Sequence, residues 1–328
     1  MTLRRITSGL VAAAALALAG ATAQAQETTI TVAEADTITG ENLVELVAFE
    51  RAAERGVTVE TISLKSDDVV FQAVLNGQAD IGIGAAYQAI QTLEAPIRHF
   101  YQLRRLAYFP VVDSTKYDNW ADLDGEVMAV HSRGSGTEAM ARYMEKVHGI
   151  SYSQLSYVPG SEVRAVAMRR GTMSASFLDL TNSRLLTEEE PDRFKILATG
   201  DETASDSILY GRNDFLDENT EAVQIVLEEL LVSAREIMED PSRAAELREE
   251  MGLLPDLPEE MVEEITPYFQ VAKQAGLFPT NGGGEQAARA DISFFTDSGT
   301  LEGSPDTIDV ENFWRFDILE AAREAVAE

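Results

Sequence analysis

The first part of the chain alternates between two hydrophobic periods, one typical of strands and one typical of helices. Thr28–Ala35 places β-branched and small residues in alternation, which predicts a strand, and Asn42–Arg55 repeats apolar residues at helical spacing. Ser66 is expected to cap the helix that follows it, and Gly77 to end that helix. The same alternation predicts strands at Val57–Leu64 and Ala79–Gly84 and helices at Asp67–Asn76 and Tyr87–Leu93. Strands separated by helices run parallel, so this segment predicts a βαβαβ unit.

A second series of strands and helices begins near Asn119. Strands are expected at Glu126–His131, Leu155–Val158, Met173–Leu178 and Phe194–Ala198, and helices at Glu138–His148 and Glu162–Arg170. From Asp217 onward the pattern is mostly helical, and Thr220–Met238 carries an apolar stripe opposite an acidic face. The pattern therefore predicts an α/β protein of two lobes, each a mostly parallel sheet flanked by helices, with a helical C-terminal region.

The N-terminus has the pattern of a secretory signal peptide. Met1–Arg5 contains two arginines, Ile6–Gly20 is apolar, and Ala23-Gln24-Ala25 has the small residues of a cleavage site. The apolar run is shorter than the roughly 20 residues that span a membrane. The chain has no cysteine that could carry a lipid. We therefore expect cleavage near Ala25, export to the periplasm without a direct lipid anchor, and a monomer.

The expected division of the chain follows from these patterns. Residues 1–25 form the signal peptide, residues 26–112 and 205–328 form the first lobe with the helical tail, and residues 113–204 form the second lobe. The chain is expected to cross between the lobes near Val111–Lys116 and again near Thr199–Gly211, so that the lobes can rock about two short segments.

Charge and composition exclude several classes of function. The 26 Lys and Arg against 56 Asp and Glu give a net charge of −30, which disfavours nucleic acid as a partner. With no cysteine there is no disulfide, iron–sulfur or cysteine-built zinc site, and the three histidines lack metal-ligand spacing. Gly134-Ser135-Gly136 is not a nucleophile elbow, and no Walker loop is present. We expect no metal, no cofactor and no catalysis.

Three segments resemble a known family. They are Leu75–Gly82, which is similar to an LxxGQxDIG step, Trp120–Gly125 followed by Gly134-Ser135-Gly136-Thr137, and Asp309–Trp314 with Ile318–Ala322. Their order and spacing resemble type-2 periplasmic solute-binding proteins of ABC importers, in the branch for sulfonates, taurine, nitrate and thiamine precursors. Glu126 departs from the family's usual lysine, and Asp36–Gly40 lacks the glycine-rich stretch that some members have. The resemblance implies the type-2 fold, closure of two lobes on a small ligand, and an ABC permease in the inner membrane as partner.

The candidate ligand contacts lie in loops that follow predicted strands, where open α/β sheets bind ligands. They are Asp36, Ser66, Gly84, Tyr87, Arg133, Gly134, Ser135, Gly136, Thr137 and Asp179. The backbone of Gly134–Thr137 precedes a helix and could hold an anionic oxygen, with Arg133 adding a fork of donors. A plain loop before a capped helix would explain the same four residues. Asp179 could accept from a ligand amine or hydroxyl, or simply cap a helix that starts near Thr181.

Other side chains could complete the site. Glu34 is an alternative to Asp36 at the end of the first strand, and Tyr210 and Phe177 could join Tyr87 against an apolar ligand body. The expected function is capture of a small organic anion, with an aliphatic sulfonate or taurine as the first choice. A receptor of the same fold that serves a TRAP carrier or a membrane sensor, and an exported enzyme on this scaffold, are the alternatives.

Overall fold

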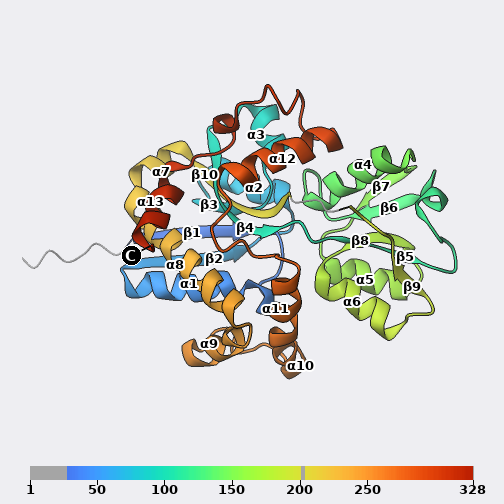
Figure 1. Cartoon of the computed structure of the whole chain (residues 1–328), viewed down its shortest axis with the longest axis horizontal. Coiled ribbons are helices and arrows are strands. Elements are labelled where there is room, and N and C mark those ends of the chain that lie inside the picture. The colour runs from blue at the N-terminus through green and yellow to red at the C-terminus, as the bar shows by residue number, and fades with distance from the viewer. Residues whose placement is uncertain (1–27, 201–203, 328) are drawn as a thin grey trace, which may run out of the picture.

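Two five-stranded sheets form the framework of the computed structural model, which describes residues 28–200 and 204–327 (Figure 1). The first sheet has the order β2-β1-β3-β10-β4 and the second the order β7-β6-β8-β5-β9. The strands of the first sheet are β1 (Thr28–Glu34), β2 (Val57–Ser63), β3 (Ile81–Ile83), β4 (Ile97–Arg105) and β10 (Ser205–Arg212). Those of the second are β5 (Phe109–Asp113), β6 (Val127–Val130), β7 (Gln154–Tyr157), β8 (Ala175–Leu178) and β9 (Phe194–Ile196).

Each sheet contains one strand that runs against the other four. In the first sheet β1 is parallel to β2 and β3, whereas β10 is antiparallel to β3 and β4. In the second sheet β6 is parallel to β7 and β8, whereas β5 is antiparallel to β8 and β9. The prediction of two mostly parallel sheets is therefore confirmed. Both antiparallel strands are the ones by which the chain enters a sheet after leaving the other.

Helices cover both faces of each sheet. The region before β10 contributes α1 (Leu43–Glu54), α2 (Asp67–Leu75), α3 (Tyr87–Leu93), α4 (Gly136–His148), α5 (Ser161–Arg169) and α6 (Leu180–Glu189). The region after β10 contributes α7 (Asn213–Glu218), α8 (Thr220–Glu239), α9 (Arg243–Met251), α10 (Glu259–Glu263), α11 (Ile265–Gln274), α12 (Glu285–Ser298) and α13 (Asp317–Ala325). Short 3₁₀ turns lie at Gly40–Asn42, Trp120–Leu123 and Val310–Asn312. The predicted helical C-terminal region is confirmed.

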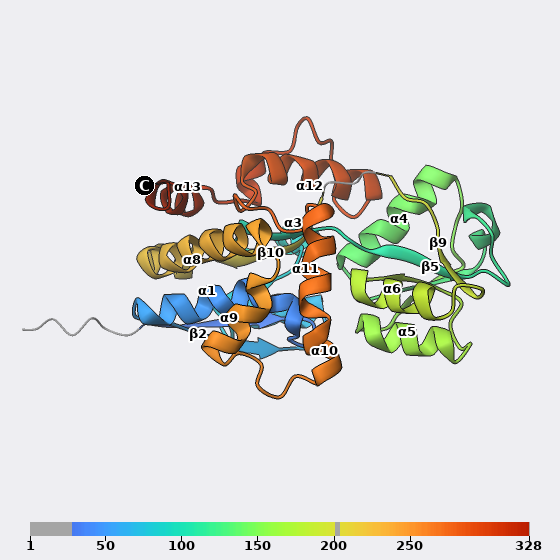
Figure 2. The same ribbon diagram turned by 60° about the horizontal axis from the view of Figure 1, so that its bottom comes forward.

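The apolar stripe predicted for α8 forms the buried face of this helix. Val223, Leu227, Leu230 and Leu231 are at most 2% exposed and pack with residues of α1 and α13 on one face of the first sheet. A separate hydrophobic cluster on the other face joins α2, α3 and α12. That cluster continues into the second lobe through Met140 and Met144 of α4, and the rings of Tyr143 and Phe294 lie 5.2 Å apart. The two lobes therefore share apolar packing where α12 meets α4 (Figure 2).

The crossings between the sheets differ from those expected. β5 already pairs in the second sheet at Phe109, so the first crossing occupies residues 106–108 rather than Val111–Lys116. The return lies between β9 and β10, across residues 197–204, and β10 is part of the first sheet from Ser205 onward. The pattern missed β4, β5 and β10 as strands. The expected lobe limits at 112/113 and 204/205 stay predictions.

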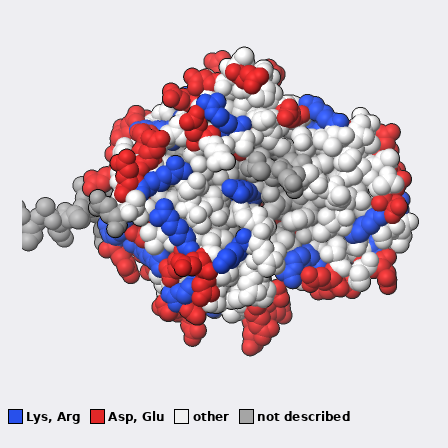
Figure 3. Space-filling view, viewed as in Figure 1, with Lys and Arg blue, Asp and Glu red and all other residues white. Residues whose placement is uncertain are grey.

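The expected signal peptide, residues 1–25, lies outside the described residues. Within residues 28–200 and 204–327, no helix has both the length and the apolarity needed to cross a bilayer. Acidic side chains gather at the rim of the molecule, notably over α9 and α10 at the bottom of Figure 3, while uncharged surface dominates the middle of that face.

Candidate functional site

The starts of five helices meet where the two lobes face each other. α2 and α3 begin at the edge of the first sheet, and α4, α5 and α6 begin at the edge of the second. A pocket of about 330 Å³ opens where α2 and α3 approach the loop that precedes α4. Its walls include Asp67, Phe71, Gly84, Ala86 and Tyr210 from the first lobe and Arg133 and Gly134 from the second. Both lobes therefore contribute to one small cavity with an apolar floor and charged walls, as ligand pockets usually have.

The Gly134–Thr137 loop satisfies most of its own polar groups. The Ser135 hydroxyl caps α4 by accepting from Glu138 N at 3.3 Å, and it donates to Ser132 O at 2.8 Å. The Thr137 hydroxyl accepts from His131 N at 2.8 Å. Gly134 N donates to the Glu138 carboxylate at 2.7 Å. Glu138 thus occupies part of the anion-binding position that this loop was expected to offer a ligand. Within the described part of the chain, the Gly136 and Thr137 amides have no acceptor.

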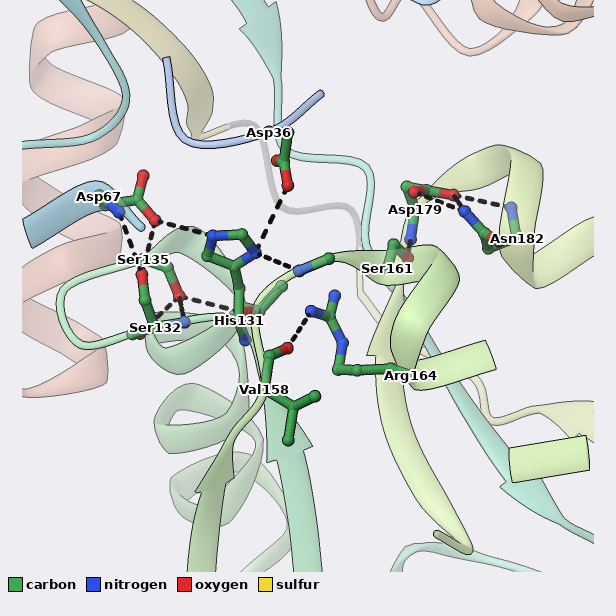
Figure 4. Close-up of polar contacts among 12 residues, drawn as sticks. Asp36, Asp67, His131, Ser132, Ser135, Val158, Ser161, Arg164, Asp179 and Asn182 are labelled. Carbon is green, nitrogen blue, oxygen red and sulfur yellow. Dashed lines mark hydrogen bonds and ion pairs between the residues drawn. The ribbon is translucent and has the colours of Figure 1, made fainter. Parts of the chain in front are cut away.

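Asp67 of the first lobe meets Ser132 and His131 of the second lobe across the seam (Figure 4). The Ser132 hydroxyl donates to Asp67 Oδ2 at 2.7 Å, and His131 Nε2 lies 3.7 Å from the same oxygen. On its other side His131 Nδ1 accepts from Gly160 N at 3.3 Å and lies 3.7 Å from Asp36 Oδ1. The His131 side chain is buried, and its Nε2 has no hydrogen-bond partner. A distance of 3.7 Å is too long for a hydrogen bond, so this donor is not satisfied.

The first lobe presents carboxylates whose pKa values are raised. Burial raises the pKa of Asp67, although His131 and Ser132 lower it in part. Burial likewise raises the pKa of Asp206 to about 6 and that of Glu34 to about 7, against the opposing effect of Arg104. Arg104 is itself held by Glu45, with Nη2 3.4 Å from Oε1. The cations near this edge are therefore too few to stabilise every carboxylate in its ionised form.

Two glycines allow close packing at the seam, Gly84 within the first lobe and Gly136 between the lobes. A Cβ on Gly84 would lie 3.0 Å from Asp67 Oδ1, and the φ of Gly84 is +149°, a region that side chains rarely adopt. A Cβ on Gly136 would lie 2.9 Å from the Leu106 side chain and 3.2 Å from Asp206 Oδ1. The start of α4 thus sits directly against a carboxylate and an apolar side chain of the crossing segment and β10.

Arg133 is the positive group of the pocket. Its guanidinium carbon lies 4.6 Å from the centre of the Tyr157 ring, a cation–π arrangement, and its side chain is exposed. Across residues 28–200 and 204–327 it forms no ion pair with a carboxylate. Arg133 can therefore receive an acidic group without first losing a partner.

The rest of the second lobe's edge is tied together internally. Asp179 caps α6 by accepting from Asn182 N at 2.7 Å, and its own N–H donates to Ser161 Oγ at 3.0 Å. Arg164 is buried and donates to Val158 O at 2.8 Å and to Phe177 O at 3.1 Å. Of the two roles considered for Asp179, the structure shows the cap; a ligand contact by Asp179 stays a prediction.

The structure corrects the placement of some predicted residues. Tyr87 is fully buried in the core of the first lobe, where its hydroxyl donates to Asp291 and accepts from Trp314, so it cannot face the cleft. Phe177 is also core, whereas Tyr210 lines the pocket. Ser66 precedes α2 without a side-chain cap hydrogen bond, contrary to expectation, and Asp36 lies exposed near His131.

The sequence patterns missed three groups at the seam. The patterns mark Asp67 only as the first residue of a predicted helix and His131 only as the end of a predicted strand, and Asp206 lies in the unexpected strand β10. A usable signal existed for Asp67, since an acid at a helix start after a strand lies at the ligand-binding edge of a parallel sheet.

The chain matches one family model, described as NMT1/THI5 like, over residues 52–244. No curated protein sequence matches it significantly. Among solved structures, a protein of Bordetella bronchiseptica has a TM-score of 0.73 at 17% identity, covering 92% of this chain and 98% of that one. The periplasmic aliphatic sulphonate binding protein of Escherichia coli has a TM-score of 0.62 at 14% identity, covering 88% and 92%.

The periplasmic nitrate-binding protein of Synechocystis has a TM-score of 0.67 at 15% identity, covering 91% of this chain and 89% of that one. These identities are low, so the structural matches speak for the fold alone. The family match covers more than half of the chain. The chain therefore belongs to the NMT1/THI5-like family and has the two-lobed fold of periplasmic binding proteins.

Proposed function

We propose that this chain is the periplasmic solute receptor of an ABC importer and captures a small organic ligand between its two lobes. The observation that carries the proposal is the pocket itself, because an unpaired cation from one lobe, Arg133, and a carboxylate from the other, Asp67, line the same small cavity. The family match and the sulfonate- and nitrate-binding proteins with this fold support a solute-binding role.

Closure of the lobes is the mechanism that fits this geometry. The Asp67–Ser132 hydrogen bond and the contact of Thr181 with Glu41 both cross the seam. Opening would break these contacts while the crossing segment at 106–108 and the packing of α12 on α4 keep the lobes together. A ligand that touches both walls stabilises the closed form by the difference between its interactions with the two forms. No chemical step is required.

The ligand of first choice is an aliphatic sulfonate or taurine, because each carries the acidic group that the sequence predicts. Arg133 is the donor that the pocket offers to sulfonate oxygens, and Ser135 orders the adjoining loop. Gly84, Gly134 and Tyr210 would surround the ligand body. Delivery to a permease in the inner membrane then follows from the closed form of the receptor.

A thermal-melting screen of the mature chain tests the proposal. Ligands that bind only the folded protein raise the melting temperature, so at least one member of a panel of sulfonates, taurine, nitrate, bicarbonate and pyrimidines should do so at millimolar concentration. Arg133→Gln should weaken binding of that ligand, and mass spectrometry should recover the ligand unchanged. No melting shift with any panel member, or conversion of the ligand to a product, would contradict a transport receptor.

A further inference from the structure

The two walls of the pocket differ in charge in a way that bears on the ligand. The first lobe brings the carboxylates of Asp67 and Asp206 to the seam, and Asp206 Oδ1 faces the Gly136 backbone of α4. Glu138 already accepts from Gly134 N in the same loop. The positive end of α4 is thus next to two carboxylates of the protein itself. A ligand that brought only negative charge to this point would be repelled by them.

Only one of the two oxygens of the Asp67 carboxylate accepts a hydrogen bond from the described residues. Its Oδ2 accepts from the Ser132 hydroxyl at 2.7 Å. Its Oδ1 accepts no hydrogen bond within residues 28–200 and 204–327 and is directed at Gly84, on the pocket wall. Because Gly84 has no side chain, no Cβ crowds this oxygen at the pocket wall. A carboxylate oxygen aimed into a pocket binds an N–H donor, most strongly a charged one.

Apart from Arg133, which lines the pocket from the second lobe, the arginines near the seam are held by groups other than Asp67. Arg104 lies beside Glu45, and Arg164 donates to the carbonyls of Val158 and Phe177. His131 Nδ1 accepts from Gly160 N, so the neutral ring carries its proton on Nε2, which points at Asp67 from 3.7 Å and has no partner. Asp67 Oδ1 therefore has no hydrogen-bond donor among the described residues, and the neighbouring buried His131 Nε2 has no partner either.

We propose that the ligand carries a protonated nitrogen that donates to Asp67 Oδ1, so that Asp67 selects ligands with an ammonium or similar cationic group over simple anions. This inference rests on the proposed receptor function. In a zwitterion the acidic end reaches Arg133, and in a plain organic cation that end is missing. Phe71, Ala86 and Tyr210 form the apolar floor for the carbon chain between the two ends.

The protonation of Asp67 fits the same role. Burial raises the pKa of the Asp67 carboxyl in the ligand-free protein, and a ligand cation beside it would lower that pKa again. Binding should therefore release a proton in the pH range where the free carboxylate is partly protonated. Affinity for the ligand should accordingly rise with pH until the ligand nitrogen itself loses its proton.

Matched ligands separate the contribution of the nitrogen from that of the acid. Titration calorimetry of the mature protein compares taurine with propanesulfonate and propylamine, and homotaurine with butanesulfonate and butylamine. Each set keeps the length while removing one charged end. The ammonium-bearing sulfonate should bind about 10- to 100-fold more tightly than the methyl-ended one, as expected for a charge-assisted hydrogen bond. If the alkylamine binds as tightly as the zwitterion, the ligand is a plain cation and the inference holds without a role for Arg133.

Variants assign the preference to Asp67. In Asp67→Asn the preference for the ammonium ligand should disappear, whereas Ser132→Ala keeps the carboxylate and should keep the preference. Asp297→Asn removes an equal charge from an exposed site on α12 and should change no affinity by more than about twofold.

The outcomes separate the two proposals. Equal affinities for the ammonium and methyl ligands in the wild type would overturn the inference and leave the receptor function intact. A preference that survives in Asp67→Asn would overturn the role of Asp67. Failure of every ligand in both sets and in the wider panel would overturn the receptor function as well.

Discussion

The starts of α2 and α4 face each other across the pocket and differ in how far the protein satisfies their hydrogen-bonding groups. At α4 the Ser135 hydroxyl caps the helix and the Glu138 carboxylate accepts from Gly134 N, so the loop is largely complete without a ligand. At α2 the Ser66 side chain caps nothing, and Asp67 has an oxygen directed at the cavity. The loop before α4 has the pattern of an anion site, but the protein's own Glu138 carboxylate occupies it. The start of α2 has no such pattern, yet it carries the carboxylate oxygen that lacks a donor among the described residues. An inventory of hydrogen bonds is thus a better guide to a ligand than the appearance of a loop.

The same contrast extends along the two edges. The first lobe's edge carries Glu34, Asp67 and Asp206, whose pKa values are all raised, chiefly by burial. The second lobe's edge is held by neutral hydroxyls and backbone bonds, with Arg133 at its surface. The first edge is therefore sensitive to pH and to cations, and the second is held in place by its own hydrogen bonds.

The largest effect is expected on the pH dependence of stability in Glu34→Gln, which removes a carboxylate from the first lobe's edge. Burial raises the pKa of Glu34 to about 7, so the folded protein holds this proton up to a higher pH than the unfolded chain does. The stability that comes from the raised pKa is present at low pH and is lost progressively as pH rises from the ordinary value of 4.5 to about 7. A glutamine cannot ionise and can still accept from Asn42. The variant should be more stable than the wild type by about 3 kcal/mol at pH 8 and by less than about 1 kcal/mol at pH 5.

Urea unfolding of both proteins at pH 5 and pH 8 measures this difference. The control is Glu285→Gln, which removes an exposed carboxylate at the start of α12 and should give parallel curves for variant and wild type. If Glu34→Gln and the wild type lose the same stability between the two pH values, Glu34 is ionised in the folded protein throughout, and the acidic edge is better neutralised than its contacts indicate.

A smaller effect is expected where the two edges touch, in Gly136→Ala. The added methyl would come within 2.9 Å of Leu106 and 3.2 Å of Asp206, so it presses the closed lobes apart. The backbone of Gly136 is ordinary helix, and alanine suits a helix better than glycine, so the fold itself should not weaken. Ligand affinity should fall about tenfold, or about 1.4 kcal/mol, while the melting temperature without ligand stays equal or rises.

Calorimetric titration with a ligand found in the screen, together with small-angle X-ray scattering, measures both sides of this prediction. The variant should remain more open than the wild type at a ligand concentration that saturates the wild type. Unchanged affinity and an unchanged scattering curve would mean that closure does not bring α4 against Asp206, and the close approach of the two edges would then have no part in binding.

Much of the fold follows from pattern, but three strands do not. β1, β2 and β3 and the helices after them lie within a few residues of their predicted ranges because each buries a regular apolar face. β4 was missed because its buried positions include His99 and Gln102, which a hydropathy pattern counts as polar. His99 is accommodated by bonds to Ala86 N and Phe313 O, and these partners are distant in sequence. Such tertiary compensation is invisible to a local pattern.

The candidate site was located in outline and misread in detail. The loops before α2, α3 and α4 meet at one pocket, and Arg133, Gly134 and Gly84 line it as expected, whereas Asp36 and Asp179 lie outside its lining. Tyr87 was misplaced because an aromatic at a helix start can turn to the core as easily as to the cleft, and here Asp291 supplies the partner its hydroxyl needs. Sequence alone also cannot show that Glu138 would reach back to Gly134 N, since that depends on the path of the loop.

The smallest expected effects compare the two helix starts directly, through Ser135→Ala and Ser66→Ala. Ser135 caps α4 and also bonds to Ser132 O, so its replacement should cost about 1 kcal/mol of unfolding free energy, the usual value of an N-cap. Ser66 makes no cap bond, so its replacement should stay within about 0.5 kcal/mol. Urea unfolding at pH 7 without ligand measures both values. Equal losses in the two variants would mean that Ser66 does cap α2 in solution, and the contrast between a filled and an open helix start would no longer hold. Ligand affinity gives a second comparison. If Ser66→Ala binds the ligand more weakly than the wild type does, the hydroxyl of Ser66 contacts the ligand beside Asp67.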